Sequence, residues 1–147
     1  MRFLRVLTGM VVLVAVLALV LTSCPSNRDG MPGQLATAKE ETQSAARSAA
    51  LALQLWAQHR STRDLTCVQL ADARDENVKA YGGIATLKAE DPVDLGRQAM
   101  LAHTMTDLIG ALNDANAAVR ALPGRPDPQA LGQQLLAGAD ALERNYH

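Results

Sequence analysis

Apolar and small residues recur at alternating gaps of three and four in the stretch that follows residue 33. This spacing places them on one face of an α-helix, and it predicts a helix over residues 34–60. The stripe consists of Leu35, Ala38, Thr42, Ala45, Ala49, Ala52 and Trp56. Because most of these side chains are small, the stripe suits close packing against another helix, either within the same bundle or from a partner.

Ser61 and Asp64 begin a second predicted helix, which runs to about residue 81, and they resemble a capping box with Asp in place of Glu. Two sets of apolar residues could form its inward face, and the sequence leaves the choice open. They are Leu65, Val68, Ala71 and Val78, or Cys67, Leu70 and Tyr81. Gly82-Gly83 is expected to end or kink this helix, with residues 84–88 adding a turn or two.

The third predicted helix has the clearest apolar pattern in the chain. Asp91-Pro92 marks its start, since aspartate caps a helix and proline fits the first turn. Pro123-Gly124 stops it. Its seam keeps gaps of four and three over three heptads, as in a helix bundle. The seam consists of Leu101, Met105, Leu108, Leu112, Ala115, Val119 and Leu122.

Asp127-Pro128 starts a fourth predicted helix, whose apolar face contains Leu131, Leu135, Leu142 and Tyr146. Four amphipathic helices with short connections predict an all-α fold, an antiparallel four-helix bundle over residues 34–147. The alternative is an extended helical hairpin that buries its stripe in another subunit. The composition favours helices, because aromatic residues are 3% of the chain and the apolar residues are mainly Ala, Leu and Val.

Residues 1–24 differ in character from the rest of the chain. Arg2 and Arg5 give a basic start, residues 6–21 are almost wholly apolar, and small residues follow. This arrangement predicts a secretory signal peptide over residues 1–23, cleaved from the mature protein. The apolar run is somewhat short for a permanent membrane helix, which needs about 20 residues.

The end of this leader resembles the lipobox of bacterial lipoprotein precursors. In that family a large aliphatic residue and two small residues precede an invariant cysteine, and here the four residues are Leu21, Thr22, Ser23 and Cys24. The resemblance implies cleavage between Ser23 and Cys24 and a diacylglyceryl thioether on the Cys24 sulfur. It covers about the first sixth of the chain and implies nothing about the rest.

Residues 24–33 are polar and rich in Pro and Gly, which predicts a short lipidated tether between the membrane and the bundle. The expected location is therefore the extracytoplasmic face of the cell membrane, with lipid on Cys24 as the link. Without Arg2 and Arg5, 12 of the 14 basic residues remain against 15 acidic ones, a net charge of −3. This balance lacks the positive face that nucleic acid requires. The expected partner is a protein or a second copy of the chain.

No residue pattern predicts a catalytic, metal or cofactor site. If Cys24 is acylated, Cys67 has no partner within the chain and is expected in the core, with an intermolecular disulfide or a reactive thiol as alternatives. His59, His103 and His147 are not spaced as helical metal ligands.

Two small groups of charged residues are expected on exposed helix faces. His103 and Asp107 are one turn apart and are expected to form a solvated pair. Asp72, Asp75 and Glu76 lie beside Arg74 and lack the glycine and the spacing of a calcium loop. Both groups are interpreted as ordinary surface features.

A second resemblance is to exported four-helix b-type cytochromes, which bind haem through a Met near the start of the first helix and a His near the end of the last. The matching residues are Met31 and His147. The chain departs from that pattern, because Met31 precedes Pro32-Gly33 and is expected outside the helix, and His147 is the last residue.

Two functions remain as hypotheses. The first is a non-enzymatic lipoprotein module that binds a protein partner, or supports envelope assembly, at the membrane surface. The second is a carrier that holds a small molecule or a cofactor such as haem between its helices. A closed core would favour the first function, and a polar-lined cavity containing His103 or His147 would favour the second.

Overall fold

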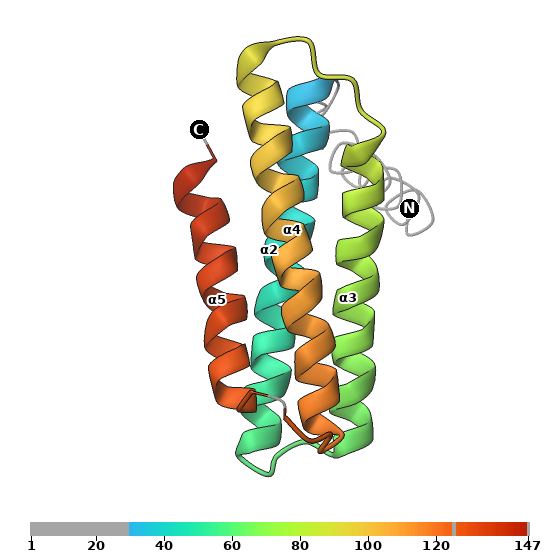
Figure 1. Cartoon of the computed structure of the whole chain (residues 1–147), viewed down its shortest axis with the longest axis vertical. Coiled ribbons are helices and arrows are strands. Elements are labelled where there is room, and N and C mark those ends of the chain that lie inside the picture. Colours follow the sequence, from blue (N-terminus) through green and yellow to red (C-terminus); the bar gives the residue numbers. More distant parts are fainter. Residues whose placement is uncertain (1–29, 125, 147) are drawn as a thin grey trace, which may run out of the picture.

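The computed structural model describes residues 30–124 and 126–146, which form four α-helices and no strand. The helices are α2 (Met31–Ala57), α3 (Arg63–Ala85), α4 (Pro92–Val119) and α5 (Pro128–Asn145). Successive helices run in opposite directions along one long axis (Figure 1). The predicted all-α, antiparallel four-helix bundle is confirmed. The extended hairpin is wrong, because the four helices pack on one another.

Helices α2 and α4 contact each other across the middle of the bundle, and each also packs against α3 and α5. In Figure 1, α3 and α5 lie on opposite sides, and the described residues of these two helices do not touch. The cross-section is therefore a rhombus whose short diagonal joins α2 and α4. The buried face of α2 contains six alanines: Ala38, Ala45, Ala46, Ala49, Ala50 and Ala52. The small stripe predicted on this helix is thus used inside the bundle, where it allows close approach.

Leucines from all four helices fill the core beside these alanines. Those with at most 1% of their surface exposed are Leu35, Leu53, Leu70, Leu101, Leu112, Leu135 and Leu142. The predicted seam of α4 is confirmed from Leu101 to Val119. Leu122 is the exception: it lies beyond the end of α4 and is exposed, because the helix stops at Val119.

The starts of α4 and α5 are those predicted from the two Asp-Pro pairs. Asp91 Oδ1 accepts a hydrogen bond from the backbone N–H of Val93 at 2.8 Å. Asp127 Oδ2 accepts one from the N–H of Gln129 at 3.0 Å. Each aspartate thereby satisfies a donor that the first helical turn leaves without an acceptor.

The predicted capping box at the start of α3 is wrong, because the helix is capped one residue later and Leu65 has no polar side chain to complete a box. Thr62, not Ser61, is the N-cap, and its Oγ1 accepts a hydrogen bond from the N–H of Leu65 at 3.3 Å. Ser61 Oγ instead lies 2.9 Å from the hydroxyl of Thr66. Ser61 is therefore engaged with a side chain one turn into the helix and does not cap it.

Gly82-Gly83 neither ends nor breaks α3, which continues to Ala85. Glycine costs a helix interior roughly 1 kcal/mol relative to alanine. Ala80 and Ile84, on either side of the pair, are both buried in the core. Their packing holds the last turn in place, since tertiary contacts supply most of the stability of a helix in a protein.

The inward face of α3 differs from both predicted faces. In the first set, Leu65, Val68 and Val78 are exposed, so that prediction is wrong. In the second set, Leu70 is fully buried and Cys67 half-buried, but Tyr81 is exposed. The buried residues keep gaps of four and three and are Thr66, Leu70, Ala73, Asn77, Ala80 and Ile84. Two of the six are polar, so a search for apolar residues at helical spacing does not find this face.

Candidate functional sites

The predicted cleavage and lipidation residues, Ser23 and Cys24, lie outside the described residues, as does the signal peptide. The described chain begins at Gly30, at the same end of the bundle as the start of α4 (Figure 1). Met31 is already the first residue of α2, so residues 31–33 belong to the helix and not to the tether. Pro32 is tolerated because N–H groups of the first turn have no helical acceptor. None of the four described helices is long and apolar enough to cross a membrane.

Tyr146 holds the end of the described chain against α2 and α4, close to where the chain enters the bundle. Lys39 Nζ lies 5.1 Å and Arg97 Cζ 5.3 Å from the centre of its ring, within reach of cation–π attraction. Arg97 also pairs with Asp94 at 3.3 Å. The Tyr146 hydroxyl is buried and has no hydrogen-bond partner in the described part of the chain, and burial raises its pKa. The sequence offers no local signal for this cluster, because its members come from three helices.

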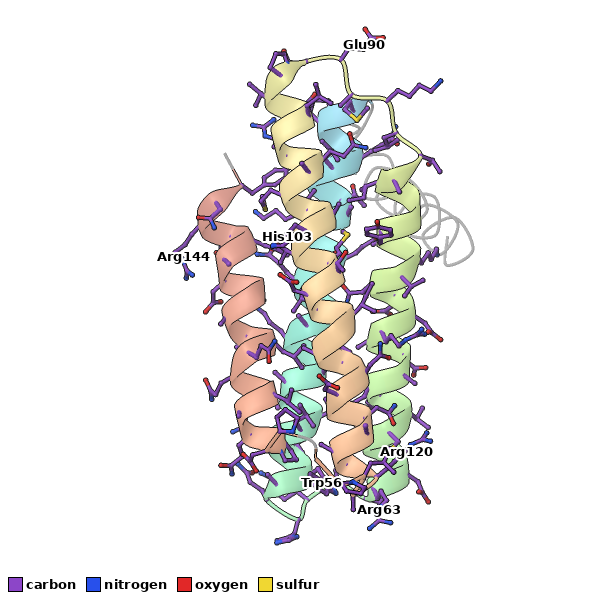
Figure 2. All side chains as sticks on the ribbon, in the orientation of Figure 1. Trp56, Arg63, Glu90, His103, Arg120 and Arg144 are labelled. Carbon is purple, nitrogen blue, oxygen red and sulfur yellow. The ribbon has the colours of Figure 1, made fainter. Side chains whose placement is uncertain are left out.

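The opposite end of the bundle contains the single tryptophan. Trp56 is half-buried and packs against the core, and Figure 2 shows Arg63 and Arg120 at the same end. Both arginines are exposed. This end therefore combines an indole with two solvated guanidinium groups, an ordinary surface arrangement on a bundle end.

Cys67 lies on the side of α3 that faces α4. It is half-buried, packs against the core, and is a free thiol. Its backbone carbonyl accepts a hydrogen bond from Asn116 Nδ2 at 3.3 Å. The expectation of a packed core cysteine agrees with this position.

The charged groups singled out in the sequence lie on the surface. His103 Nε2 is 3.4 Å from Asp107 Oδ2, and both side chains are exposed, which confirms the solvated pair. Arg74 Nη1 is 2.7 Å from Asp75 Oδ1. Asp72 and Glu76 are exposed beside them on α3. Within residues 30–124 and 126–146, no three His, Cys, Asp or Glu side chains are grouped so as to hold a metal ion.

Of the two residues that resemble haem ligands, one lies in the described part of the chain. Met31 is the first residue of α2, contrary to the expectation that it lies outside the helix, and it packs against the core. His147 is outside the described residues. Leu35, Leu101 and Leu142 have no exposed surface, so side chains fill the space that a haem would need between the helices. The filled core does not fit a haem.

Hollows on the surface follow the grooves between neighbouring helices. The groove between α4 and α5 has a volume of about 570 Å³. Its lining combines small residues, such as Gly110 and Gly138, with polar ones, such as Asp107, Asp114 and Gln134. His103 does not line it. Of the two arrangements that distinguish the hypotheses, the described residues show the filled core.

The outward side of α3 is the feature that sequence reasoning placed wrongly. Its large apolar side chains are exposed to 52% at Leu65, 55% at Val68, 41% at Val78 and 38% at Tyr81. They follow one another along a single helix over four to five turns. At about 100° per residue, Leu65 and Tyr81 lie on opposite flanks of the helix, and exposed acidic residues stand between Val68 and Val78, so the four side chains do not form one contiguous patch.

The fold and these surfaces define a class, an antiparallel four-helix bundle with exposed apolar residues on one of its outer helices. Comparisons of the chain with protein-family models, with curated proteins and with solved structures give no match. Its function is therefore argued from its own residues.

Proposed function

We propose that this chain is a lipid-anchored envelope lipoprotein whose four-helix bundle acts by contact with a protein at the extracytoplasmic face of the cell membrane, and not by catalysis. The observation that carries the proposal is the lipobox. Leu21, Thr22, Ser23 and Cys24 stand directly after a basic start and an apolar run, where lipoprotein processing requires them. Lipid on Cys24 confines the bundle to the membrane surface.

The early start of α2 shortens the tether. Residues 25–30 separate Cys24 from the first residue of the helix. Six residues span at most about 20–22 Å in any conformation, from about 3.3–3.6 Å per residue. The bundle is therefore held near the bilayer, and its local concentration toward other surface proteins is high. Its partners lie at the membrane face.

The outward side of α3 supplies the surface for contact. Val68 and Val78 are the aliphatic residues on its middle turns and are about half exposed. Burial of apolar surface contributes roughly 25 cal/mol per Å². A protein that covers this side of α3 therefore forms a complex that is stabilised by the apolar surface it buries. The filled core also supports contact as the mode of action, since it leaves the outer surface of the bundle as the place where another molecule can bind.

The anchor is tested by mass spectrometry of the mature N-terminus. The two cysteines of the chain provide a matched pair of variants. In the parent and in Cys67→Ala, the N-terminal residue should be an acylated Cys24. Cys24→Ala should lose the lipid mass and lipoprotein-type processing. An unmodified Cys24, or a mature end elsewhere in the chain, would overturn the proposal.

Contact as the mode of action is tested by crosslinking in cells. The anchored chain should give a discrete crosslinked product at the membrane. Cys24→Ala, which removes the lipid from the chain, should weaken that capture, whereas Cys67→Ala should retain it. The proposal is wrong if only monomer is found while the purified protein turns over a substrate or retains a bound cofactor.

A further inference from the structure

The end of the bundle farthest from Gly30 is formed by the last turns of α2 and α4, the first turns of α3 and α5, and the loops that join them (Figure 1). Trp56, Arg63 and Arg120 lie at this end (Figure 2). Arg60 and Leu122 stand in the loops that follow α2 and α4. These five residues are here called the distal end. An indole beside guanidinium groups is common on a bundle end, but guanidinium groups without a carboxylate partner are less so.

The arginines of the distal end have no such partner. Arg60, Arg63 and Arg120 are all exposed, and no ion pair within the described part of the chain includes them. On the sides of the bundle, Arg47 and Arg74 each lie 2.7 Å from a carboxylate oxygen. In a chain with 15 acidic and 14 basic residues, the distal end is therefore a local surplus of positive charge.

Two aspartates lie near the distal end, and both serve the helix starts. Asp127 Oδ2 accepts hydrogen bonds from the N–H groups of Gln129 and Ala130 at 3.0 and 3.3 Å. Asp64 is in the first turn of α3, where the helix dipole favours a negative charge. Three guanidinium groups against these two carboxylates leave the end with a net positive charge.

The residue types of this end are those that dominate binding energy at protein interfaces. Tryptophan and arginine are enriched among such residues, whereas lysine and glutamate are depleted in the centre of interfaces. Residues 56–66 and 119–128 contain no lysine and no glutamate. Trp56 is half-buried and Leu122 is exposed to 50%, so both have apolar surface left to cover. Guanidinium groups bind carboxylates through two parallel hydrogen bonds, which ammonium groups do not form.

We propose that the distal end binds an acidic segment of a partner protein. Carboxylates of that segment pair with Arg60, Arg63 and Arg120, and its apolar side chains cover Trp56 and Leu122. This surface is separate from the side of α3. The proposal deepens the proposed function, because it names the chemistry of the protein partner, and it rests on that function for the position of the anchor.

The loops hold part of this surface in place before binding. The N–H of Arg60 donates to the carbonyl of Leu55 at 2.8 Å, and the N–H of Leu122 donates to the carbonyl of Ala117 at 3.1 Å. Each loop is thereby closed onto the end of its own helix. A fixed backbone lowers the conformational entropy that is lost when a partner binds.

The anchor prevents the distal end from facing its own bilayer. α2 has 27 residues and is about 40 Å long, so the distal end lies about 40 Å from Met31. The six residues between Cys24 and Met31 span at most about 20–22 Å. If the distal end rested on the bilayer, Met31 would be out of reach of the lipid. The distal end therefore faces other proteins of the membrane surface.

Photo-crosslinking of the full-length chain in cells tests the site. A photo-crosslinking amino acid replaces Leu122, and the control position is Val93, which is exposed to 55% on the first turn of α4 at the other end of the bundle. Position 122 should give a product that position 93 does not give, and mass spectrometry should find a partner segment with net negative charge. Absence of that product, the same product from both positions, or a neutral or basic segment would overturn the proposal.

Reversal of single charges tests the role of the arginines. Arg63→Glu should lower the yield of the Leu122 product at least about tenfold, since it replaces an attractive charge pair with a repulsive one. Arg63→Lys keeps the charge without the paired hydrogen bonds and should give an intermediate yield. Arg144→Glu is the matched control, because Arg144 is exposed on the last turn of α5 and should leave the yield unchanged. Equal yields from Arg63→Glu and Arg144→Glu would overturn the proposal.

Trp56 is the single tryptophan of the chain, so its fluorescence reports binding at the distal end. The captured segment, as a synthetic peptide, is titrated against the chain reconstituted in phosphatidylcholine vesicles. The emission should change saturably, and a peptide with Asn and Gln in place of Asp and Glu should bind at least about tenfold more weakly. Inorganic polyphosphate and vesicles with phosphatidylglycerol should not change the emission. Equal binding of the amide peptide, or a response to polyphosphate or to the anionic vesicles, would overturn the proposal.

The N-terminal mass separates this proposal from the anchor. An acylated chain that gives no product at position 122 keeps the anchor and loses the acidic partner. An unmodified Cys24 in a chain that still gives the product contradicts the anchor, and the arginine dependence of the product then supports the distal end by itself.

Discussion

Gly138 brings α5 directly against Leu108 of α4. A Cβ atom at position 138 would lie 2.8 Å from Leu108 Cδ2 and 3.4 Å from Leu108 Cγ. Leu108 is 2% exposed and belongs to the core, so its neighbours restrict any movement away. The missing side chain at this one position therefore sets how closely the two helices approach.

Gly138→Ala should destabilise the bundle by about 1 kcal/mol. Overpacking costs roughly 1–3 kcal/mol, and the gain in helix propensity offsets about 1 of these. Gly110→Ala is the control, because a Cβ at that position of α4 meets no atom within 4 Å. Gly110→Ala should be stabilising. Urea unfolding followed by circular dichroism measures both. If the two changes stabilise the protein equally, the Leu108 side chain can move aside without destabilising the core, and the prediction is wrong.

Two buried threonines provide a second test at the level of single side chains. Thr42 and Thr66 have no exposed surface, yet Thr42 Oγ1 has no hydrogen-bond partner in the described residues. Thr66 Oγ1 donates to the carbonyl of Thr62 at 2.9 Å. Thr42→Val removes a buried hydroxyl without a partner and should stabilise the protein by about 1 kcal/mol. Thr66→Val should destabilise it. The prediction is wrong if both changes shift the urea midpoint in the same direction.

At the level of elements, α2 and α4 end in the same way. The N–H of Arg60 donates to the carbonyl of Leu55 at 2.8 Å, and the N–H of His59 donates to that of Trp56 at 2.9 Å. This pattern is a Schellman motif, which requires a left-handed residue. His59 takes that role with φ 55°, and Ala121 takes it at the end of α4 with φ 60°. Both helices thus stop at a non-glycine residue in a conformation that favours glycine.

His59→Gly and Ala121→Gly should each stabilise the protein by about 0.5–1 kcal/mol. A side chain in the left-handed region costs roughly 1–2 kcal/mol, and the greater freedom of glycine in the unfolded chain cancels part of the gain. Thermal unfolding measures the effect. Gly124→Ala is the reverse control, because Gly124 already has φ 74° and should lose stability. A fall in Tm for both glycine variants would contradict the strain assigned to His59 and Ala121.

The described residues form one continuous core, and α2 contributes to it beside all three other helices. Its alanine face allows contact with α3, α4 and α5 at once. α5 is the shortest of the four described helices, with 18 residues, and the ring of Tyr146 at its end lies against Lys39 of α2 and Arg97 of α4. Because all four helices share the core, a disruptive substitution at its centre should destabilise all four of them.

Leu108→Asp should lower the free energy of unfolding by about 4 kcal/mol or more, since it buries a charge that has no partner. Much of the helical circular dichroism and the cooperative thermal transition should be lost. Thr106→Asp is a control on the same helix, because Thr106 is exposed, and it should change stability by no more than about 0.5 kcal/mol. A Leu108→Asp variant as stable as the parent would contradict the bundle core.

Local and periodic signals in the sequence determined the class of fold, the two Asp-Pro helix starts and the α4 seam. Each of these features depends on residues within one helix, because side-chain spacing sets which face of the helix is apolar and capping side chains set where the helix begins. The tertiary structure decided the inward face of α3, since Thr66 and Asn77 interrupt the apolar pattern and packing against α2 and α4 outweighs their polarity. It also decided the cluster of Lys39, Arg97 and Tyr146, because residues so distant in the chain are brought together only by the packing of three helices.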